Sequence, residues 1–285
     1  MTKRRHFIKT GALLLPTLLL PRKAHASGFG YFGPLHPQTV AWLQTIRGTQ
    51  QSDVAPGTVM AANRYVGTIK AAGLVGKFFH HNLYVGRNLA AMAVCILPKP
   101  IILTLTGFVE GDFTEATGLI GGSGKYINFP APNTFTTPGF HMGCYVRTAS
   151  DEATVCMGGQ HPGTCDAALY VSYSGTTYWD AYNTTTGRCS FADSSGTGLY
   201  IGNRSLSAGK VYKNGVERAS TSGASGNACD SSIDVHGLVD SGSGHIQPTS
   251  RRLALLTFGE SLTGTEITAL YNAGQALHTE LGRQV

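Results

Sequence analysis

Residues 198–216 read GLYIGNRSLSAGKVYKNGV, and this stretch contains two strand patterns followed by a turn motif. Its two short runs, 198–204 and 209–213, have the alternation of strands that bury one face. Asn214 and Gly215 follow the second run, and this pair takes the positive φ angles that a two-residue type I′ turn requires. The stretch therefore predicts a strand followed by a β-hairpin.

Similar short runs, separated by Gly, Ser, Asn and Pro, continue over most of the chain between residues 89 and 259. Their spacing is typical of an all-β sandwich. The composition agrees, because the chain contains 37 glycines and few charged residues. The other predicted strands cover 91–97, 101–106, 126–129, 140–148, 153–157, 167–174, 177–183, 232–238 and 252–258.

Helical patterns lie on both sides of this region. A helical segment is predicted over 36–82, with one helix that begins at Pro37 and a second that begins at Pro56. At the other end, Thr263 and Glu266 form a capping box in front of a C-terminal helix. We therefore divide the chain into a signal peptide (1–26), a helical N-terminal segment (27–88) and a β-sandwich with a C-terminal helix (89–285).

Several stretches resemble laminin-G-like domains of the concanavalin A-like lectin/glucanase superfamily. The hairpin with Lys213, Asn214 and Gly215 resembles their tyrosine-x-asparagine-glycine signature, and LALLTFGESLTGTEI at 253–267 resembles their last core strand and following helix. Three further stretches resemble the segment that leads into such modules in phage tail and bacterial surface proteins. They are KAAGL at 70–74, NLAA at 88–91 and GLIGGSGKYI at 118–127. The resemblance implies a mainly β fold, a jelly-roll sandwich of two antiparallel sheets, whose concave face binds saccharide in some members.

The first 26 residues have the pattern of an export signal. Arg4 and Arg5 precede a short apolar stretch, as in twin-arginine (Tat) signals, and an Ala-His-Ala motif predicts cleavage between Ala26 and Ser27. An ordinary Sec signal and an uncleaved anchor remain open. The apolar stretch is interrupted by Pro16 and is short for a membrane span, so we expect no stable membrane anchor. The expected partners are the Tat machinery and signal peptidase, and the expected location is periplasmic or secreted.

Net charge argues against a nucleic-acid partner. Six of the chain's 22 basic residues and none of its 16 acidic residues lie in the signal, so the mature chain has equal numbers of both. No basic stripe stands out elsewhere.

The six cysteines all lie in the mature part, which fits an oxidising destination. Six cysteines allow fifteen pairings, so the sequence cannot give the connectivity. Cys156 and Cys165 flank a short turn that contains Gly and Pro, and we predict a disulfide between them.

One acidic pattern is a candidate catalytic site. Glu110, Asp112 and Glu115 spell the ExDxxE pattern of laminarinase-type β-glucanases. The resemblance would make Glu110 the nucleophile, Asp112 its helper and Glu115 the acid/base of a retaining hydrolase. Their position near the start of the sandwich favours a solvated loop instead.

No cofactor motif appears, although a calcium ion is possible. Asp230, Asp234 and Asp240 offer oxygen ligands, as in some laminin-G-like domains, but without the spacing of a defined calcium loop.

Aromatic residues are the better ligand candidates. Tyr178, Trp179 and Tyr182 lie in one predicted strand next to the strand that carries Tyr170 and Tyr173. Flat rings are usual platforms for sugar faces. Alternation places Tyr178 and Tyr182 on one face and Trp179 on the other, and either face could be sandwich core.

The sequence thus predicts an exported, non-catalytic module that binds a glycan or another surface partner. A retaining glycoside hydrolase that uses Glu110 and Glu115 is the alternative. A structural coat or tail-like protein without a small ligand is the third possibility.

Overall fold

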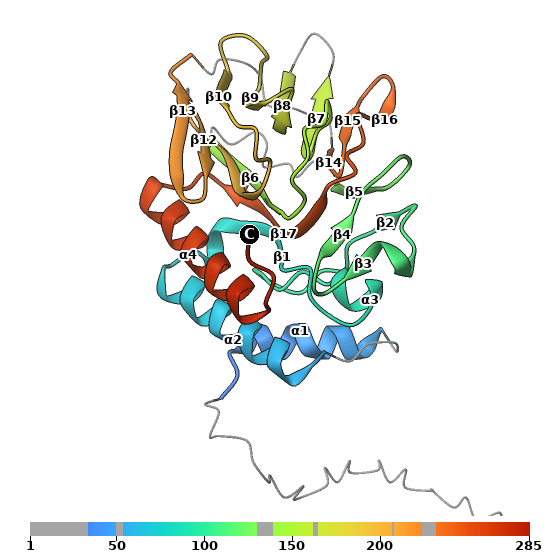
Figure 1. Cartoon of the computed structure of the whole chain (residues 1–285). Helices are drawn as coiled ribbons and strands as arrows, with labels where there is room; N and C mark the ends of the chain where they lie inside the picture. The colour runs from blue at the N-terminus through green and yellow to red at the C-terminus, as the bar shows by residue number, and fades with distance from the viewer. Residues whose placement is uncertain (1–33, 50–53, 130–138, 162–164, 207, 224–231) are drawn as a thin grey trace, which may run out of the picture. The chain divides into compact units, whose positions relative to one another are not determined.

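A computed structural model describes residues 34–49, 54–129, 139–161, 165–206, 208–223 and 232–285 (Figure 1). The predicted signal peptide and Asp230 lie outside these residues. The described chain belongs almost entirely to one compact unit, Leu35–Val285. It is mainly β, with two sheets, as predicted.

The first sheet, which we call the covered sheet, contains eight strands in the described residues. Seven of them follow the order β13-β12-β11-β6-β17-β4-β3, and β1 pairs with β17. All of its pairings are antiparallel. The bounds are β1 (Phe78–Asn82), β3 (Phe113–Thr114), β4 (Gly118–Ile120), β6 (Gly139–Val146), β11 (Gly198–Ser205), β12 (Ala208–Lys213), β13 (Val216–Thr221) and β17 (Arg252–Glu260).

The second sheet, which we call the open sheet, has the order β10-β9-β8-β7-β14-β5-β2. The hairpin of β15 and β16 attaches to β7 through the one parallel pairing among the described strands, Val239 with Gly159. The bounds are β2 (Leu105–Thr106), β5 (Tyr126–Phe129), β7 (Met157–His161), β8 (Cys165–Tyr173), β9 (Thr176–Ala181), β10 (Arg188–Ala192), β14 (Ile233–Val235), β15 (Leu238–Asp240) and β16 (Gly244–Ile246).

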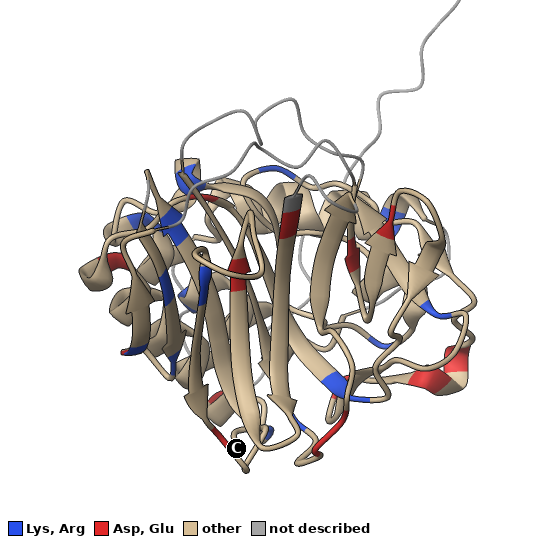
Figure 2. Ribbon diagram, turned by 90° about the horizontal axis from the view of Figure 1, so that it is seen from above, with Lys and Arg blue, Asp and Glu red and all other residues tan. Residues whose placement is uncertain are grey.

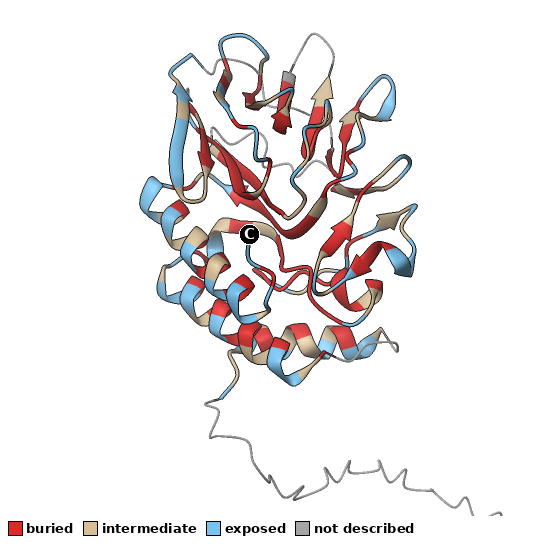
Figure 3. Ribbon diagram, viewed as in Figure 1, coloured by how far each residue is buried: buried red, intermediate tan, exposed pale blue. Residues whose placement is uncertain are grey.

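The two sheets pack face to face around one hydrophobic core (Figure 3). Strand alternation separates this core from a second one. Met142 and Cys144 of β6 point into the core between the sheets, whereas Tyr145 points to the opposite face. The covered sheet therefore buries both of its faces.

Helices cover that opposite face. The buried side of α2 (Pro56–Ala71) and α4 (Gly264–Glu280) packs with Tyr145, Leu199 and Ile201 in the second core, and α1 (Pro37–Gly48) adds Trp42. Figure 1 shows these helices together on one side of the sandwich. The layers are thus helices, covered sheet and open sheet.

The predicted helices form where their local signals placed them. Proline lies in the first turn of both α1 and α2. The capping box of α4 is complete, since Thr263 Oγ1 accepts from the amide of Glu266 and the Glu266 carboxylate accepts from the amide of Thr263. The hairpin prediction is also confirmed, because Asn214 and Gly215 have φ angles of 53° and 77°.

Two parts of the chain differ from the prediction. Residues 78–82 form strand β1 rather than helix, because they pair with an edge of β17 that β4 leaves free. The expected boundary at residue 88 therefore falls after the sandwich has begun. Residues 91–97 were expected to be strand, but Asn88 caps the short helix α3 (Leu89–Met92) by accepting from the amide of Ala91 at 2.9 Å.

The predicted disulfide between Cys156 and Cys165 is wrong. Cys156 is a buried free thiol at the start of the β7–β8 hairpin, where its amide donates to the carbonyl of Leu169. Cys165 pairs with His161 at the other end. Five residues of extended chain separate the two levels, about 16 Å at 3.3 Å per residue, whereas a disulfide needs Cα atoms about 4.4–6.8 Å apart.

Candidate functional site

The outer face of the open sheet is the sheet surface that the helices leave uncovered. The strand register brings Ala168 of β8, Asp180 of β9 and Arg188 of β10 into one row across this face. Tyr170 and Tyr178 form the next row. Because alternate residues share a face, these side chains point away from the core that Leu169 and Trp179 enter.

A bulge in β8 adds a third tyrosine. Plain alternation would put Tyr173 on the core side with Val171, but the register shifts between Tyr170 and Tyr173. Ser172 has a φ angle of 44° at this point and its amide donates to Thr177 Oγ1 at 3.0 Å. The bulge turns Tyr173 to the outer face, beside Tyr170.

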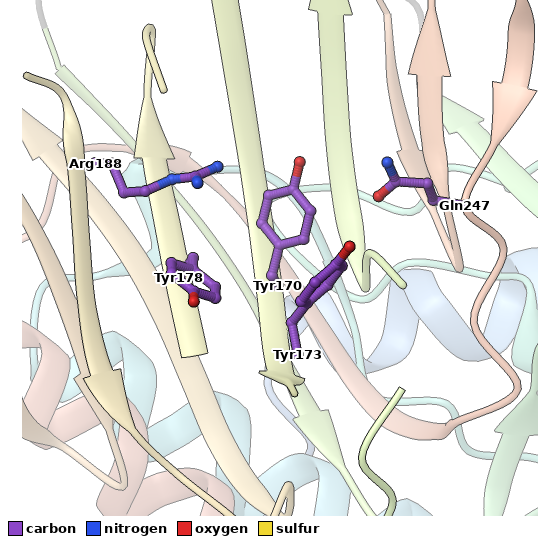
Figure 4. A pocket seen from close by; sticks show the side chains of 5 residues that line it. All are labelled: Tyr170, Tyr173, Tyr178, Arg188 and Gln247. Atoms are coloured by element: carbon purple, nitrogen blue, oxygen red, sulfur yellow. The ribbon is translucent and has the colours of Figure 1, made fainter. Parts of the chain in front are cut away.

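The three tyrosines line a pocket of about 210 Å³ together with Arg188 and Gln247 (Figure 4). Their rings are nearly perpendicular to one another, with interplanar angles of 80°, 82° and 87° and centroids 5.7–6.3 Å apart. Figure 4 shows Arg188 and Gln247 on opposite sides of the tyrosines. The rings thus form a corner rather than a flat platform.

An ion pair fixes the position of Arg188. Its Nε and Nη2 atoms each donate to one carboxylate oxygen of the fully buried Asp180, both at 2.6 Å. This bidentate geometry holds the guanidinium 5.0 Å from the ring centroid of Tyr178 and 5.8 Å from that of Tyr170. Asp180 uses two of the five guanidinium N–H groups, so three can face a ligand.

A second buried carboxyl, Asp166, lies beside this pair. Burial raises its pKa to about 7, the charge of Asp180 adds to the rise, and Arg188 opposes it. Its Oδ1 atom is buried without a hydrogen-bond partner among the described residues. The pocket therefore borders on a carboxyl group that changes charge near neutral pH.

Two of the three predicted ligand-binding aromatics lie in the core instead. Trp179 is fully buried between the sheets and meets Phe140 edge to face at 5.4 Å. Tyr182 follows β9 with a φ angle of 74°, which breaks the alternation, and its ring stacks on Phe140. Of the predicted set only Tyr178 lines the pocket.

Two residues that line the pocket, Arg188 and Gln247, were not identified from the sequence. Arg188 reaches the site through the pairing of β10 with β9, and Gln247 comes from the segment after β16. A charged residue after an aromatic strand was the only local signal for Arg188, and no local signal marked Gln247.

The three acids of the ExDxxE pattern hold separate parts of the chain. Glu110 accepts from the amide of Leu89 at 3.1 Å. Glu115 accepts from Thr58 Oγ1 at 2.6 Å and from the amide of Gly86 at 2.7 Å. Asp112 accepts from the amide of Val109 and forms an ion pair with Lys125 Nζ at 2.5 Å. The contacts of Glu115 tie the N-terminal segment to the sandwich, and the contacts of the three acids give no support to the hydrolase roles.

The described calcium candidates are bound to protein groups. Asp234 accepts from Asn128 Nδ2 and contacts His245 Nδ1, while Asp240 accepts from the side chain of Gln160 and the amides of residues 242 and 243. Within the described ranges no cluster of three or more His, Cys, Asp or Glu residues could hold a metal. Asp230 lies outside those ranges.

Acidic and basic residues are interspersed over the strands and loops seen from above (Figure 2). Among the helices of the described chain, none is both long and apolar enough to cross a membrane.

No protein-family model matches the sequence, and no curated protein matches it. Solved structures with similar folds include a Trypanosoma rangeli sialidase bound to 2,3-difluorosialic acid (14% identity, TM-score 0.47), which covers 75% of this chain and 38% of its own. The binding domain of botulinum neurotoxin DC in complex with SialylT has 9% identity and a TM-score of 0.47, with coverage of 70% and 51%.

Domain 4 of AbnA, a GH43 extracellular arabinanase from Geobacillus stearothermophilus in complex with arabinotriose, has 13% identity and a TM-score of 0.44, with coverage of 68% and 98%. The chain spans about half or less of the sialidase and toxin structures. Likenesses this distant carry no argument about function, which therefore depends on the geometry above.

Proposed function

We propose that this protein is an exported, non-catalytic β-sandwich module of the laminin-G-like type that binds a glycan in the tyrosine pocket of its open sheet. The observation that carries the proposal is the corner formed by Tyr170, Tyr173 and Tyr178 beneath the fixed guanidinium of Arg188.

The shape of the corner suits a sugar. A sugar carries C–H groups on its faces and hydroxyl groups around its edge, so it can place C–H groups against more than one of the perpendicular rings. The pocket is also small, about 210 Å³, which suits one or two sugar units.

The polar groups suit hydroxyl recognition. Arg188 has three N–H groups that Asp180 does not use, and Gln247 contributes an amide on the opposite side of the pocket. Because Asp180 neutralises Arg188, the pocket has no unpaired cation to select a strongly acidic ligand. An uncharged sugar unit is the ligand that this arrangement favours.

Export through the Tat machinery, followed by release or a periplasmic location, is part of the proposal. It is supported by the signal-like pattern with Arg4 and Arg5 and by the Ala-His-Ala motif that predicts cleavage between Ala26 and Ser27. Fusing residues 1–26 to a reporter tests it: export that Arg4→Lys with Arg5→Lys abolishes supports the Tat route, and unchanged export contradicts it.

A glycan array probed with the purified full chain tests the binding proposal. Binding of a defined set of saccharides by the wild type, and its loss in Arg188→Gln and Tyr173→Ala, is the expected result. Running the array with and without calcium checks the possible role of a cation near Asp230. A surface-protein partner or self-assembly would instead give no array binding, and light scattering would reveal the latter.

A further inference from the structure

A second pocket, of about 170 Å³, is lined by Ile246 and Pro248, the neighbours of Gln247 in the tyrosine pocket. Its lining comes from the start of β5, from β14, from the turn at His236 and from β16. The pocket is lined by the polar side chains of Lys125, Tyr126, Asp234, His236 and His245. The proposed function does not use any of them.

His245 is held in one orientation. Its Nδ1 contacts Asp234 Oδ2, and Asp234 is fully buried with its other oxygen accepting from Asn128 Nδ2 at 2.8 Å. The imidazole stacks on the ring of Tyr126 with centroids 3.3 Å apart and planes 19° apart. A carboxyl group at Nδ1 fixes the orientation of the ring and leaves Nε2 on the side away from Asp234.

His236 forms the buried wall of the same pocket. Neither of its ring nitrogens has a hydrogen-bond partner among the described residues, although the side chain is fully buried. Burial lowers its pKa to about 3, with Asp112 opposing and Lys125 adding to the change, so the ring is neutral. An unpaired buried imidazole is costly, so this wall holds unsatisfied hydrogen-bonding groups directly behind the cavity.

The backbone at this wall is strained. His236 and Gln247 have φ angles of 68° and 49°, in a region that residues other than glycine rarely adopt. Each of them lines one of the two pockets. Such strain persists where the surroundings enforce it, and it concentrates at ligand sites.

The polar groups of the second pocket contact one another. Lys125 Nζ lies 2.5 Å from Asp112 Oδ1, and the buried Asp234 carboxyl contacts His245 Nδ1. The groups without a partner in these contacts are the other N–H donors of Lys125, Nε2 of His245, and the two ring nitrogens of the buried His236. A neutral molecule rich in hydroxyl groups matches this set better than an ion does.

The two pockets share one wall. Ile246 and Pro248 line the second pocket, and Gln247 between them lines the tyrosine pocket. We infer that the pocket of Tyr126, His236 and His245 is a second saccharide subsite, so that the ligand is an oligosaccharide that crosses the segment at Gln247 and occupies both pockets. This inference depends on the proposed function, because it extends the same binding site.

The test uses the full chain and the mono- to hexasaccharides of each linear series on the glycan array. Calorimetry with the shortest members that bind should give equal affinities for the wild type and His245→Ala. Longer members should bind the wild type about tenfold more tightly, and His245→Ala should lose that gain. His161→Ala, a histidine of β7 outside both pockets, is the matched control and should retain it.

A measurement on the wild type guards against misfolding of the variant, since His245→Ala leaves Asp234 with one partner fewer. The imidazole NMR signals of His245 and His236 should shift with the longer saccharides and stay unchanged with the shortest. Loss of binding in Tyr178→Ala, together with a length-dependent gain that His245→Ala retains in full, would overturn the second subsite alone. Absence of any glycan binding would overturn the proposed function as well.

Discussion

The indole ring of Trp179 in β9 lies directly against the backbone of Gly202 in β11, where the two sheets meet. A Cβ atom added to Gly202 would lie 2.3 Å from two atoms of that ring. The absence of a side chain at Gly202 thus sets how closely the open sheet packs on the covered sheet. The opposite face of β9 carries Tyr178 and Asp180, so this contact also positions the candidate site.

We expect Gly202→Ala to destabilise the protein by about 1–3 kcal/mol, the usual effect of overpacking a core. Gly57→Ala is the matched control, because a Cβ there meets nothing within 4 Å and the residue lies in the first turn of α2. Urea unfolding of both variants measures the difference. Equal stabilities of Gly202→Ala and Gly57→Ala would show that the sheets can move apart to admit a methyl group at residue 202.

Asp166→Asn should change the pH dependence of stability. The folded-state pKa of Asp166 is raised to about 7, above the unfolded value near 4, so folding favours the protonated form. The stability that Asp166 contributes is therefore present at low pH and is lost as pH rises from about 4 to about 7. The variant should gain stability over wild type across this window, on the order of 1–3 kcal/mol at neutral pH.

Unfolding curves recorded at several pH values between 4 and 8 measure this gain. A difference in the free energy of unfolding that stays constant with pH would mean that Asp166 has the same pKa in the folded and the unfolded protein.

Acid should destabilise the protein through its buried histidines. Burial lowers the pKa of His81 to about 3 and that of His141 to about 4. His141 sits between the carbonyl of Glu260 and Thr257 Oγ1. Both rings are neutral when folded and gain a proton on unfolding below pH 6.5, so their contribution is lost as pH falls from 6.5 towards 4.

His141→Gln should lower stability at pH 7 but reduce the slope below pH 6.5 by up to about 1.4 kcal/mol per pH unit. The variant His161→Gln, at a half-buried histidine of β7, is the control and is measured at the same pH values. A His141→Gln slope equal to wild type would place the acid sensitivity elsewhere.

The corrected cysteine assignment gives a further prediction. Non-reducing peptide mapping of the purified protein should find no peptide that links Cys156 to Cys165, since the β7–β8 register separates them. Cys156 should be modified by a thiol reagent only after denaturation, because it is fully buried. A linked peptide from native protein would contradict the register of β7 and β8.

Local signals in the sequence were enough to predict α1, α2, α4 and the hairpin, but not the short helix α3. Pro37, Pro56, Thr263 with Glu266, and Asn214 with Gly215 each act within a few residues. The sandwich itself followed from the spacing of the strands. The strand β1 was missed because its partner, β17, lies more than 170 residues away in the chain.

The site was only partly predictable for a related reason. Alternation along 177–183 placed Tyr178 and Trp179 on opposite faces, as the structure has them, but it could not show which face was covered. The positive φ angles at Ser172 and Tyr182 each reverse the expected side of a tyrosine, and nothing in the sequence marks those positions. His236 and His245 come together with Lys125 only through the fold.

The most direct test of glycan binding in the tyrosine pocket is the affinity of Tyr178→Ala for the saccharide that binds the wild type most tightly on the array. Tyr271→Ala, which removes a half-buried tyrosine from α4 outside the pocket, is the matched control. We predict that Tyr178→Ala loses about tenfold or more in affinity, as central aromatic contacts usually do, while Tyr271→Ala binds like wild type. Equal affinities for all three proteins would contradict a binding site at the tyrosine pocket.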